Sequence, residues 1–404
     1  MSIPWFRLFL PFAGAYFFSY FYRTINAVVG PILSHELALG AADLGLLTSA
    51  YFVAFGAAQL PLGLLLDRFG ARRVEAILLL AAATGAAVFA CGHSIGTLAL
   101  GRGLIGLGVS ACLMGAFKSF SQWVPPEKMT SLTGWIMTAG TLGALAATAP
   151  LDIALRFASW REIFVALAVI TVLISGWLFF IVPEKPTSAH PESFAEQWSG
   201  IRRILRARHF WRIAPVSFAQ IGGFMAVQSL WASTWLIHVN GYTRSSAAEH
   251  LAAMSVAMIV AYALIGLAAT RLAQRGIGAQ TLLGGGIFMA LLSLLAIVGE
   301  VSDHHYGLWI AYGAFSSSGT LSYTVVSSGF PAGLSGRVTT LCNLLSFAGA
   351  FAFQWGMGLL IDHLVAGGHT QASAHRYAFA MLLTTQTIAW LWLMLGGRQK
   401  TRPE

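Results

Sequence analysis

The stretch Gly63-Leu64-Leu65-Leu66-Asp67-Arg68-Phe69-Gly70-Ala71-Arg72-Arg73 connects two long apolar runs, 46–66 and 74–89. It places three arginines and one aspartate in a connection too short to extend far from a membrane surface. Arginine and lysine accumulate in the cytoplasmic loops of membrane proteins, so we expect this loop to face the cytoplasm. The stretch therefore predicts two membrane spans joined by an inner loop.

The second half of the chain repeats parts of this pattern. The spacing of Gly63, Arg68 and Arg72 recurs 203 residues later, at Gly266, Arg271 and Arg275. Thr270 stands where the first copy has Asp67, and two later spans end in turn at Asp152 and Asp362. A chain that repeats itself at half its length is built from two similar bundles, a plan known in transporters.

The composition is that of a membrane protein. Of 404 residues, 57% are hydrophobic and 10% are charged, which excludes an ordinary soluble domain. A span needs about 20 apolar residues. Twelve segments qualify: 8–33, 45–66, 74–92, 97–122, 130–152, 162–182, 211–238, 247–270, 279–299, 307–330, 337–362 and 376–396. We predict an all-α membrane protein with twelve transmembrane helices in two pseudo-symmetric six-helix bundles.

The polar stretch 183–210 divides the twelve spans into six and six. Its prolines break helices, and its later arginines alternate with apolar residues as in a short basic amphipathic helix. We expect an N-terminal bundle over 1–182, a cytoplasmic linker over 183–210 and a C-terminal bundle over 211–404. With both termini cytoplasmic, 18 of the 24 Lys and Arg residues fall at the cytoplasmic side. The net charge of +9 therefore reflects topology rather than nucleic-acid binding.

Arg23 is the most informative residue of the first span. At 1.5 Å per residue it lies about 22 Å from Leu8 and about 15 Å before Leu33. An arginine at a helix centre costs roughly 2.5–3.5 kcal/mol on insertion scales, which makes it a functional candidate. The acids, Glu75 among them, fall at span ends or in loops. We expect Arg23 to bind an anionic substrate, the alternative being a permanent partner on another helix.

Two of these motifs resemble the major facilitator superfamily. The pattern G-x-x-x-D-R-x-G-x-R-R matches all six specified positions of its signature between the second and third helices. The first span, with Tyr20, Arg23, Asn26 and Pro31, is similar to that of organophosphate antiporters and anion:cation symporters. That resemblance implies the major facilitator fold, with Arg23 holding a phosphate or carboxylate. Ala226 stands where phosphate-ester antiporters have a second arginine, which disfavours a dianionic phosphate.

The resemblance also implies conformational roles, near the inner face for the loop residues and nearer the outer face for Arg102. Asp67 is expected to latch the outward-facing state against the start of the eleventh helix near Arg337, and Arg102, in an Arg-Gly motif, to tie helices together. Lys118 is either a cation that reaches the inner face or a second positive element of an anion path. The expected gating residues are Gly63, Asp67, Arg68, Gly70, Arg72, Arg73, Arg102 and Arg337.

The function predicted is secondary active transport of a small organic anion, such as a carboxylate, by alternating access. The expected substrate-binding residues are Arg23, Tyr20, Asn26, Lys118, Gln228, Trp231, Tyr262, Tyr323 and Asn343. We expect a monomeric multi-pass protein of a bacterial cytoplasmic membrane, with or without a co-transported proton. The alternatives are a multidrug/proton antiporter, disfavoured because Pro150 lies outside mid-helix, and a carrier-like ligand sensor. We find no spacing typical of an enzyme, a cofactor or a metal site.

Overall fold

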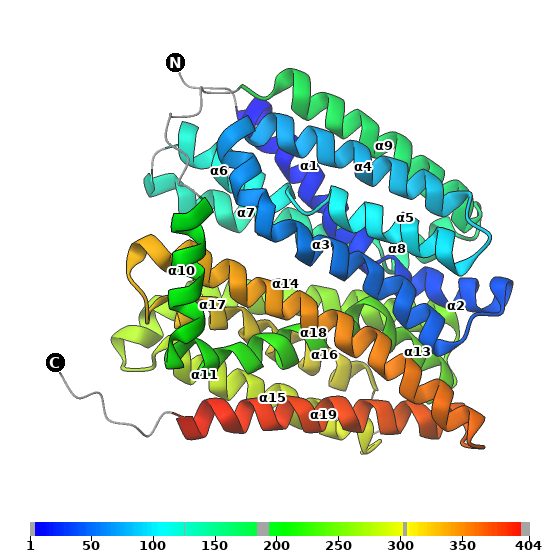
Figure 1. Cartoon of the computed structure of the whole chain (residues 1–404). Helices are drawn as coiled ribbons and strands as arrows, with labels where there is room; N and C mark the ends of the chain where they lie inside the picture. Colours follow the sequence, from blue (N-terminus) through cyan, green and yellow to red (C-terminus); the bar gives the residue numbers. More distant parts are fainter. Residues whose placement is uncertain (1–4, 125, 184–193, 302–304, 397–404) are drawn as a thin grey trace.

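The computed structural model describes residues 5–124, 126–183, 194–301 and 305–396, and every regular element in these ranges is helical. The helices run side by side in two groups, which Figure 1 shows one above the other. We call α1 to α9 the N-terminal half and α10 to α19 the C-terminal half. The all-α prediction is confirmed.

The N-terminal half contains the following helices: α1 (Trp5–Thr24), α2 (Asn26–Leu37), α3 (Ala41–Phe69), α4 (Ala71–Ala90), α5 (Ile95–Gly108), α6 (Cys112–Trp123), α7 (Pro126–Ala146), α8 (Ala149–Ala154) and α9 (Trp160–Ile181). The C-terminal half begins with α10 (Phe194–Arg206), α11 (Arg208–Val216), α12 (Gly223–Ala226) and α13 (Ala232–His238). It continues with α14 (Arg244–Gln274), α15 (Ala279–Val298), α16 (His305–Ser316), α17 (Leu321–Ser327), α18 (Ala332–Ala366) and α19 (Gln371–Leu395). Short π-helical segments, Ser217–Gly222 and Val227–Trp231, and a 3₁₀ segment, Ser317–Thr320, interrupt these runs.

Each of the twelve predicted spans coincides with one of these helical runs. In the described ranges, nine runs are long and apolar enough to cross a membrane, and a shorter apolar helix covers Leu132–Ala146. Breaks divide several of the twelve, for example between α5 and α6 and between α16 and α17. The twelve-helix arrangement agrees with the prediction, although several spans are less regular than expected.

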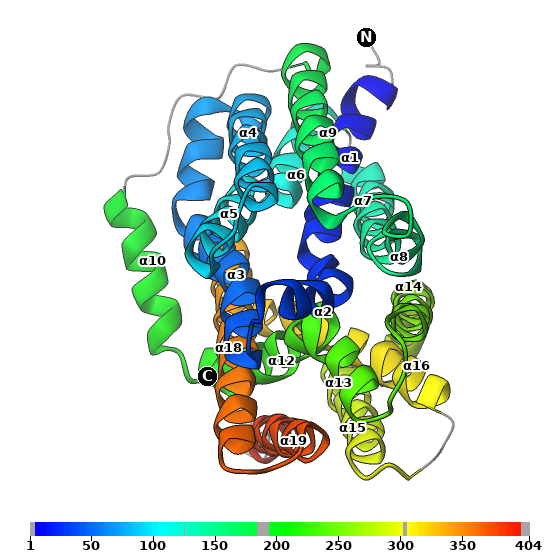
Figure 2. The same ribbon diagram turned by 90° about the vertical axis from the view of Figure 1, so that its right-hand side faces the viewer.

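The first span is bent where the sequence predicts one continuous helix over 8–33. α1 ends at Thr24 and α2 begins at Asn26, and the two run in different directions in Figure 2. Pro31 lacks an N–H and its ring disfavours a straight helix at the carbonyl four residues earlier. At the bend the Val28 N–H donates to the Ile25 carbonyl at 3.1 Å. This bond spans three residues and makes a tighter turn than the four-residue bond of an α-helix. Arg23 consequently lies in the last turn of α1, beside the bend.

We call the end that carries the Gly63-to-Arg73 loop the inner end and the opposite end the outer end, following the predicted topology. Towards the outer end, α3 and α18 cross in backbone contact. A Cβ at Gly45 would overlap the Gln354 carbonyl oxygen, and one at Gly358 would overlap that of Ala41. Near the inner end, no atom lies within 4 Å of where a Cβ would stand on Gly63 or Gly336. Gly45 and Gly358 therefore lie in backbone contact with the other half, whereas the two glycines near the inner end do not.

α10 falls in the stretch predicted to be a linker with an amphipathic helix. Its Ile204 is fully buried in an apolar cluster with Phe210, Ile213 and Val338 of the C-terminal half. The apolar face of α10 thus packs on protein. The predicted linker residues 184–193 lie outside the described ranges.

Candidate functional site

Arg23 is surrounded by aromatic rings from both halves. Its guanidinium carbon lies 4.4 Å from the centre of the Tyr20 ring, 5.5 Å from that of Phe55 and 5.6 Å from that of Phe347. Phe55 on α3 and Phe347 on α18 are themselves in contact, with ring centres 4.3 Å apart. A cation over ring faces gains about 0.5–2 kcal/mol per contact. The aromatic contacts hold Arg23 at the boundary between the halves.

These contacts leave the charge of Arg23 without a counter-ion. In the described part of the chain, no carboxylate lies within 4.0 Å of its guanidinium nitrogens. Its Nε is buried and has no hydrogen-bond partner. The side chain is half-buried between α1, α3 and α18, against rings of both halves. A guanidinium in this setting can bind a planar anionic group such as a carboxylate.

Tyr51 connects Arg23 to a second buried cation. Its hydroxyl donates to the Ser19 carbonyl at 3.2 Å, one turn before Arg23, and its ring lies 5.3 Å from the guanidinium carbon of Arg102. Arg102 is fully buried and donates through NH1 to the Tyr22 carbonyl at 2.9 Å. This bond joins α5 to the end of α1, and the conformational role that the sequence predicts for Arg102 stays a prediction.

The C-terminal half brings hydroxyl groups towards the same place. Tyr262 on α14 and Tyr323 on α17 lie within electrostatic range of both Arg23 and Tyr20. The Tyr323 hydroxyl donates to Oδ1 of Asn343 at 3.1 Å. Arg23, Tyr20, Tyr262 and Tyr323, which the sequence assigns to one site, therefore lie close together, with Asn343 bonded to Tyr323.

Other predicted binding residues are engaged in helix contacts. Asn26 is buried and donates to the Thr48 hydroxyl at 3.0 Å. Gln228 donates to the sulfur of Met258 at 3.2 Å, and Trp231 is fully buried with its ring centre 6.2 Å from that of His375. Lys118 is half-buried on α6. For these residues a substrate contact stays a prediction.

The loop at the inner end is built by glycine and arginine. Gly70 has a φ of 82°, a conformation that favours glycine, and ends α3. Arg72 donates to the Val182 carbonyl at the end of α9 at 3.4 Å, whereas Arg68 lies over the neighbouring Phe69 ring at 5.4 Å. The side chain of Asp67 lies outside the described part. Elsewhere at this end, Arg337 on α18 packs against Gly200 of α10, while Arg73 is exposed.

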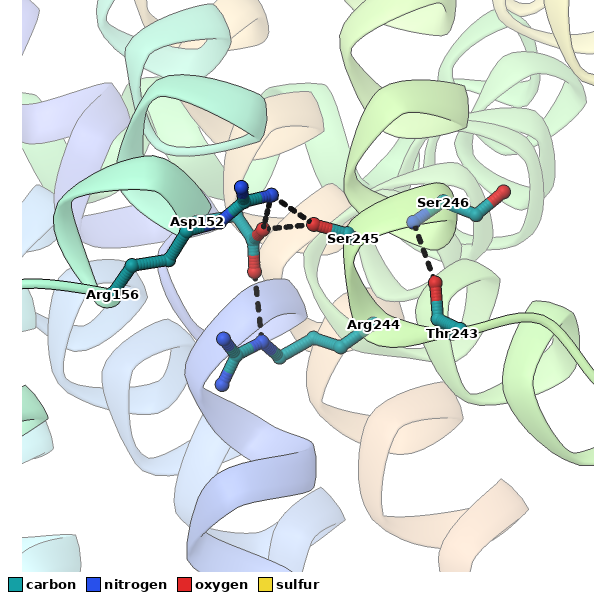
Figure 3. A network of polar contacts seen from close by, with 6 residues as sticks. All are labelled: Asp152, Arg156, Thr243, Arg244, Ser245 and Ser246. Atoms are coloured by element: carbon teal, nitrogen blue, oxygen red, sulfur yellow. Dashed lines mark hydrogen bonds and ion pairs between the residues drawn. The ribbon is translucent and has the colours of Figure 1, made fainter.

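At the outer end, Asp152 binds the first residues of α14 (Figure 3). One carboxylate oxygen accepts a bond from Nε of Arg244 at 2.7 Å, and the other accepts one from the Ser245 hydroxyl. Arg156, one turn after Asp152, reaches the same Ser245 hydroxyl at 2.7 Å. Asp152 is nearly fully buried, yet these bonds outweigh the effect of burial and hold its pKa below the ordinary value. They join the N-terminal half to the C-terminal half.

Asp362, in the C-terminal half, makes the corresponding contact with the N-terminal half. Its two carboxylate oxygens accept the backbone N–H groups of Ala41 and Ala42, at 2.9 Å and 2.7 Å. These N–H groups begin α3 and have no partner within their own helix, so the carboxylate caps it. We call the Asp152 and Asp362 contacts the outer latches.

Sequence reasoning missed Tyr51, Phe55 and Phe347 as neighbours of Arg23. Tyr51 and Phe55 are four residues apart and share one face of α3, with stacked ring centres 5.9 Å apart. An aromatic pair at that spacing is an available signal, although it is equally typical of helix packing. Nothing in the sequence indicates that Phe347, about three hundred residues further on, completes the group.

Comparisons with known proteins agree with the fold. A family model described as Major Facilitator Superfamily matches residues 12–354. A probable sulfoacetate transporter of Cupriavidus necator is 23% identical over 301 residues, covering 71% of this chain and 70% of that protein. The hexuronate transporter of Escherichia coli strain K12 is 24% identical over 234 residues, so the alignment spans about half of each chain, 54%. A bacterial homologue of the human lysosomal transporter Spinster, solved inward-facing and occupied, superposes with a TM-score of 0.77 at 16% identity, covering 99% of this chain and 98% of that one.

Proposed function

The chain belongs to the Major Facilitator Superfamily, and from this membership we propose that it is a secondary transporter of a small organic anion. It works in a membrane as a multi-pass protein, for which we propose the bacterial cytoplasmic membrane with both termini inside. The observation that carries the proposal is the Arg23 guanidinium, which lies between the halves with no carboxylate of the described residues within 4.0 Å. A visiting anion supplies the missing charge.

The chemistry around Arg23 narrows the substrate class. Arg23 can neutralise one acidic group, either a carboxylate or a sulfonate. Position 226, where phosphate-ester antiporters have a second arginine, is alanine in this chain. The hydroxyls of Tyr262 and Tyr323 and the amide of Asn343 suit a hydroxylated or polar body. Hexuronate, named for one relative, carries one carboxylate on a hydroxylated frame, as this site would require. Sulfoacetate, named for another, carries a carboxylate and a sulfonate on one methylene, so it tests whether the site accepts a second charge. Galacturonate and sulfoacetate are therefore the first probes.

The outer latches support a transport cycle by alternating access. In the arrangement seen here α3 and α18 are in backbone contact at the outer end and the two carboxylates bridge the halves, as in an inward-facing state. Opening outwards requires these bonds to break while contacts at the inner end form. The N-terminal half supplies the positive charge of the site, and the C-terminal half supplies the polar and aromatic side chains that fit the rest of the substrate. Each half moves as one bundle. A single chain forms the whole site, so a monomer suffices.

The test is uptake of radiolabelled galacturonate and sulfoacetate by proteoliposomes, together with equilibrium binding. Arg23→Gln removes the charge while keeping a polar side chain. Because hydrogen bonds to charged groups contribute about 1.5–3 kcal/mol, we expect affinity to fall about 10- to 100-fold and uptake to be lost.

Arg203→Gln is the matched control, since it removes one positive charge at an exposed position of α10. The control should keep wild-type affinity. Wild-type affinity in Arg23→Gln would refute the role of Arg23, and lack of binding of any carboxylate or sulfonate by the wild type would refute the anion class.

A further inference from the structure

Glu75 is a buried acid that the anion site does not use. The sequence places it at the inner end of a span, where exposure to solvent is expected. The structure instead buries it fully on the second turn of α4, and neither carboxyl oxygen has a hydrogen-bond partner. The carboxyl packs on α6 at Gly115, where even a single Cβ would overlap Oε2. The absence of a side chain at Gly115 is what makes room for the acid.

Among the described residues, no cation pairs with Glu75. The Cys112 thiol on α6 is the titratable group that interacts with it. On α9, Ser175 donates at 2.7 Å to the Ala76 carbonyl, so its hydroxyl is already used, and its neighbours at this level are apolar. On α5, Gly108 packs on Ala82 of α4 and brings no charge. In the described ranges Glu75 forms no ion pair.

Two cations on the helices that enclose Glu75 lie about one turn closer to the inner end. Lys118 follows Gly115 by three residues on α6, and Arg72 precedes Glu75 by three residues on α4. Arg72 donates to the Val182 carbonyl. Neither neutralises Glu75 in this arrangement. An ionised carboxylate without a partner is strongly disfavoured in such a site, so the carboxyl here carries its proton.

We propose that Glu75 is a proton-binding site of the transport cycle. In the arrangement seen here the acid is neutral and sealed between α4 and α6. It lies four residues from Ala71, about 6 Å along the helix from the inner end. A small separation of α4 and α6 admits water from the inner side, and the carboxyl then ionises and releases its proton there. The role of Glu75 in the transport cycle rests on the proposed function, whereas the protonation of its carboxyl does not.

The inner half of the fourth span is also connected to the Arg23 region. Between α5 and α6 the helix is broken, and the carbonyls of Val109 and Ser110 at the break accept bonds from Ser19 and Gln59, at 3.5 Å and 3.2 Å. Ser19 lies one turn before Arg23 on α1. A change at Arg23 on binding an anion can thus move the start of α6, the helix that seals Glu75.

The experiment has two arms. In the first, infrared difference spectra of the purified full-length protein at neutral pH compare wild type with Glu75→Gln. We expect the carbonyl band of a protonated carboxyl in the wild type and its loss in the variant, with Glu249→Gln, an exposed acid, unchanged. A band of equal size in Glu75→Gln would overturn the assignment. This arm needs no substrate, so it decides the protonation of Glu75 even if the anion proposal fails.

In the second arm, proteoliposomes take up galacturonate or sulfoacetate with the outer buffer either matched to the lumen or more acidic. We expect the gradient to stimulate wild-type uptake several-fold and to have no effect on Glu75→Gln, while anion binding and counterflow exchange persist. Glu75→Met separates this role from a structural one, because it should fold at least as stably and still lose the stimulation. Full stimulation in either variant would overturn the proposal, whereas loss of binding in the wild type would count against the transport function instead.

Discussion

Asp152 and Asp362 occupy equivalent places in the two halves, and each binds the start of a helix in the other half. Asp362 caps α3 at Ala41 and Ala42, and Asp152 binds Arg244 and Ser245 of α14. The interval from Ala41 to Arg244, like that from Ala42 to Ser245, is 203 residues, the interval of the sequence repeat. The outer end is therefore closed by two versions of one contact, related by the pseudo-symmetry of the chain.

Removing a latch should shift the protein towards an outward-open state. Asp152→Asn loses a charge-assisted contact with Arg244, and hydrogen bonds to charged groups contribute about 1.5–3 kcal/mol, so the open population should rise about tenfold or more. The measurement is the distance between spin labels at Phe157 and Val301, exposed residues at the outer end of each half, by double electron–electron resonance. Asp362→Ala should act in the same direction, and an unchanged distance distribution in both variants would refute the latch.

The Asp152 latch should also depend on external pH. Burial raises the pKa of Asp152, but the bonds from Ser245 and Arg244 outweigh it, so the pKa is lower when latched than the ordinary 3.8. A group with a lowered pKa stabilises the bonded state above its ordinary value and loses that contribution as pH falls through the lowered one. Acidifying the outer side below about pH 4 should therefore lengthen the same spin-label distance. Asp152→Asn should remove the response, and a response that persists in this variant would assign it to another group.

The difference between what the sequence predicts and what only the structure reveals follows from the range of the interactions. Hydropathy and the Gly63-to-Arg73 loop indicate the spans, because span length and loop charge are local properties. Arg23 stands out for the same reason, as a charge within an apolar run. Its neighbours Phe55 and Phe347 do not, because apolar aromatic residues look alike in every span and their meeting depends on how α3 crosses α18.

Glu75 is a residue whose surroundings the sequence predicts wrongly. Position along the chain places it at a span end, yet burial depends on what packs there, and the glycine that makes room for it is forty residues away at Gly115. Pro31 is visible in the sequence, but the helix end beside Arg23 depends on the backbone bonds formed around Ile25, several residues earlier.

Tyr51 should act as a positioning residue for Arg23. Tyr51→Phe keeps the ring that lies against Arg102 and removes the hydroxyl that bonds the Ser19 carbonyl. A single hydrogen bond contributes about 1 kcal/mol, so we expect a small loss of stability and a several-fold rise in KM for galacturonate with little change in kcat. Tyr377→Phe, at an exposed position on α19, is the control. Equal KM values in wild type and Tyr51→Phe would show that the bond serves stability alone.

Arg23 should lower the stability of the empty protein. A half-buried cation with no carboxylate partner is costly, and Met keeps the length and the contacts with Phe55 and Phe347 without the charge. We expect Arg23→Met to unfold a few degrees above the wild type, a gain of about 1 kcal/mol of the kind found when functional residues are replaced. Excess galacturonate should then reverse the order, since a ligand at 100 times its Kd stabilises a protein by about 2.7 kcal/mol and Arg23→Met should not respond. Thermal unfolding with and without galacturonate measures both effects. A variant that is less stable than the empty wild type, or that is stabilised equally by galacturonate, would mean that Arg23 is held for packing and not for the anion.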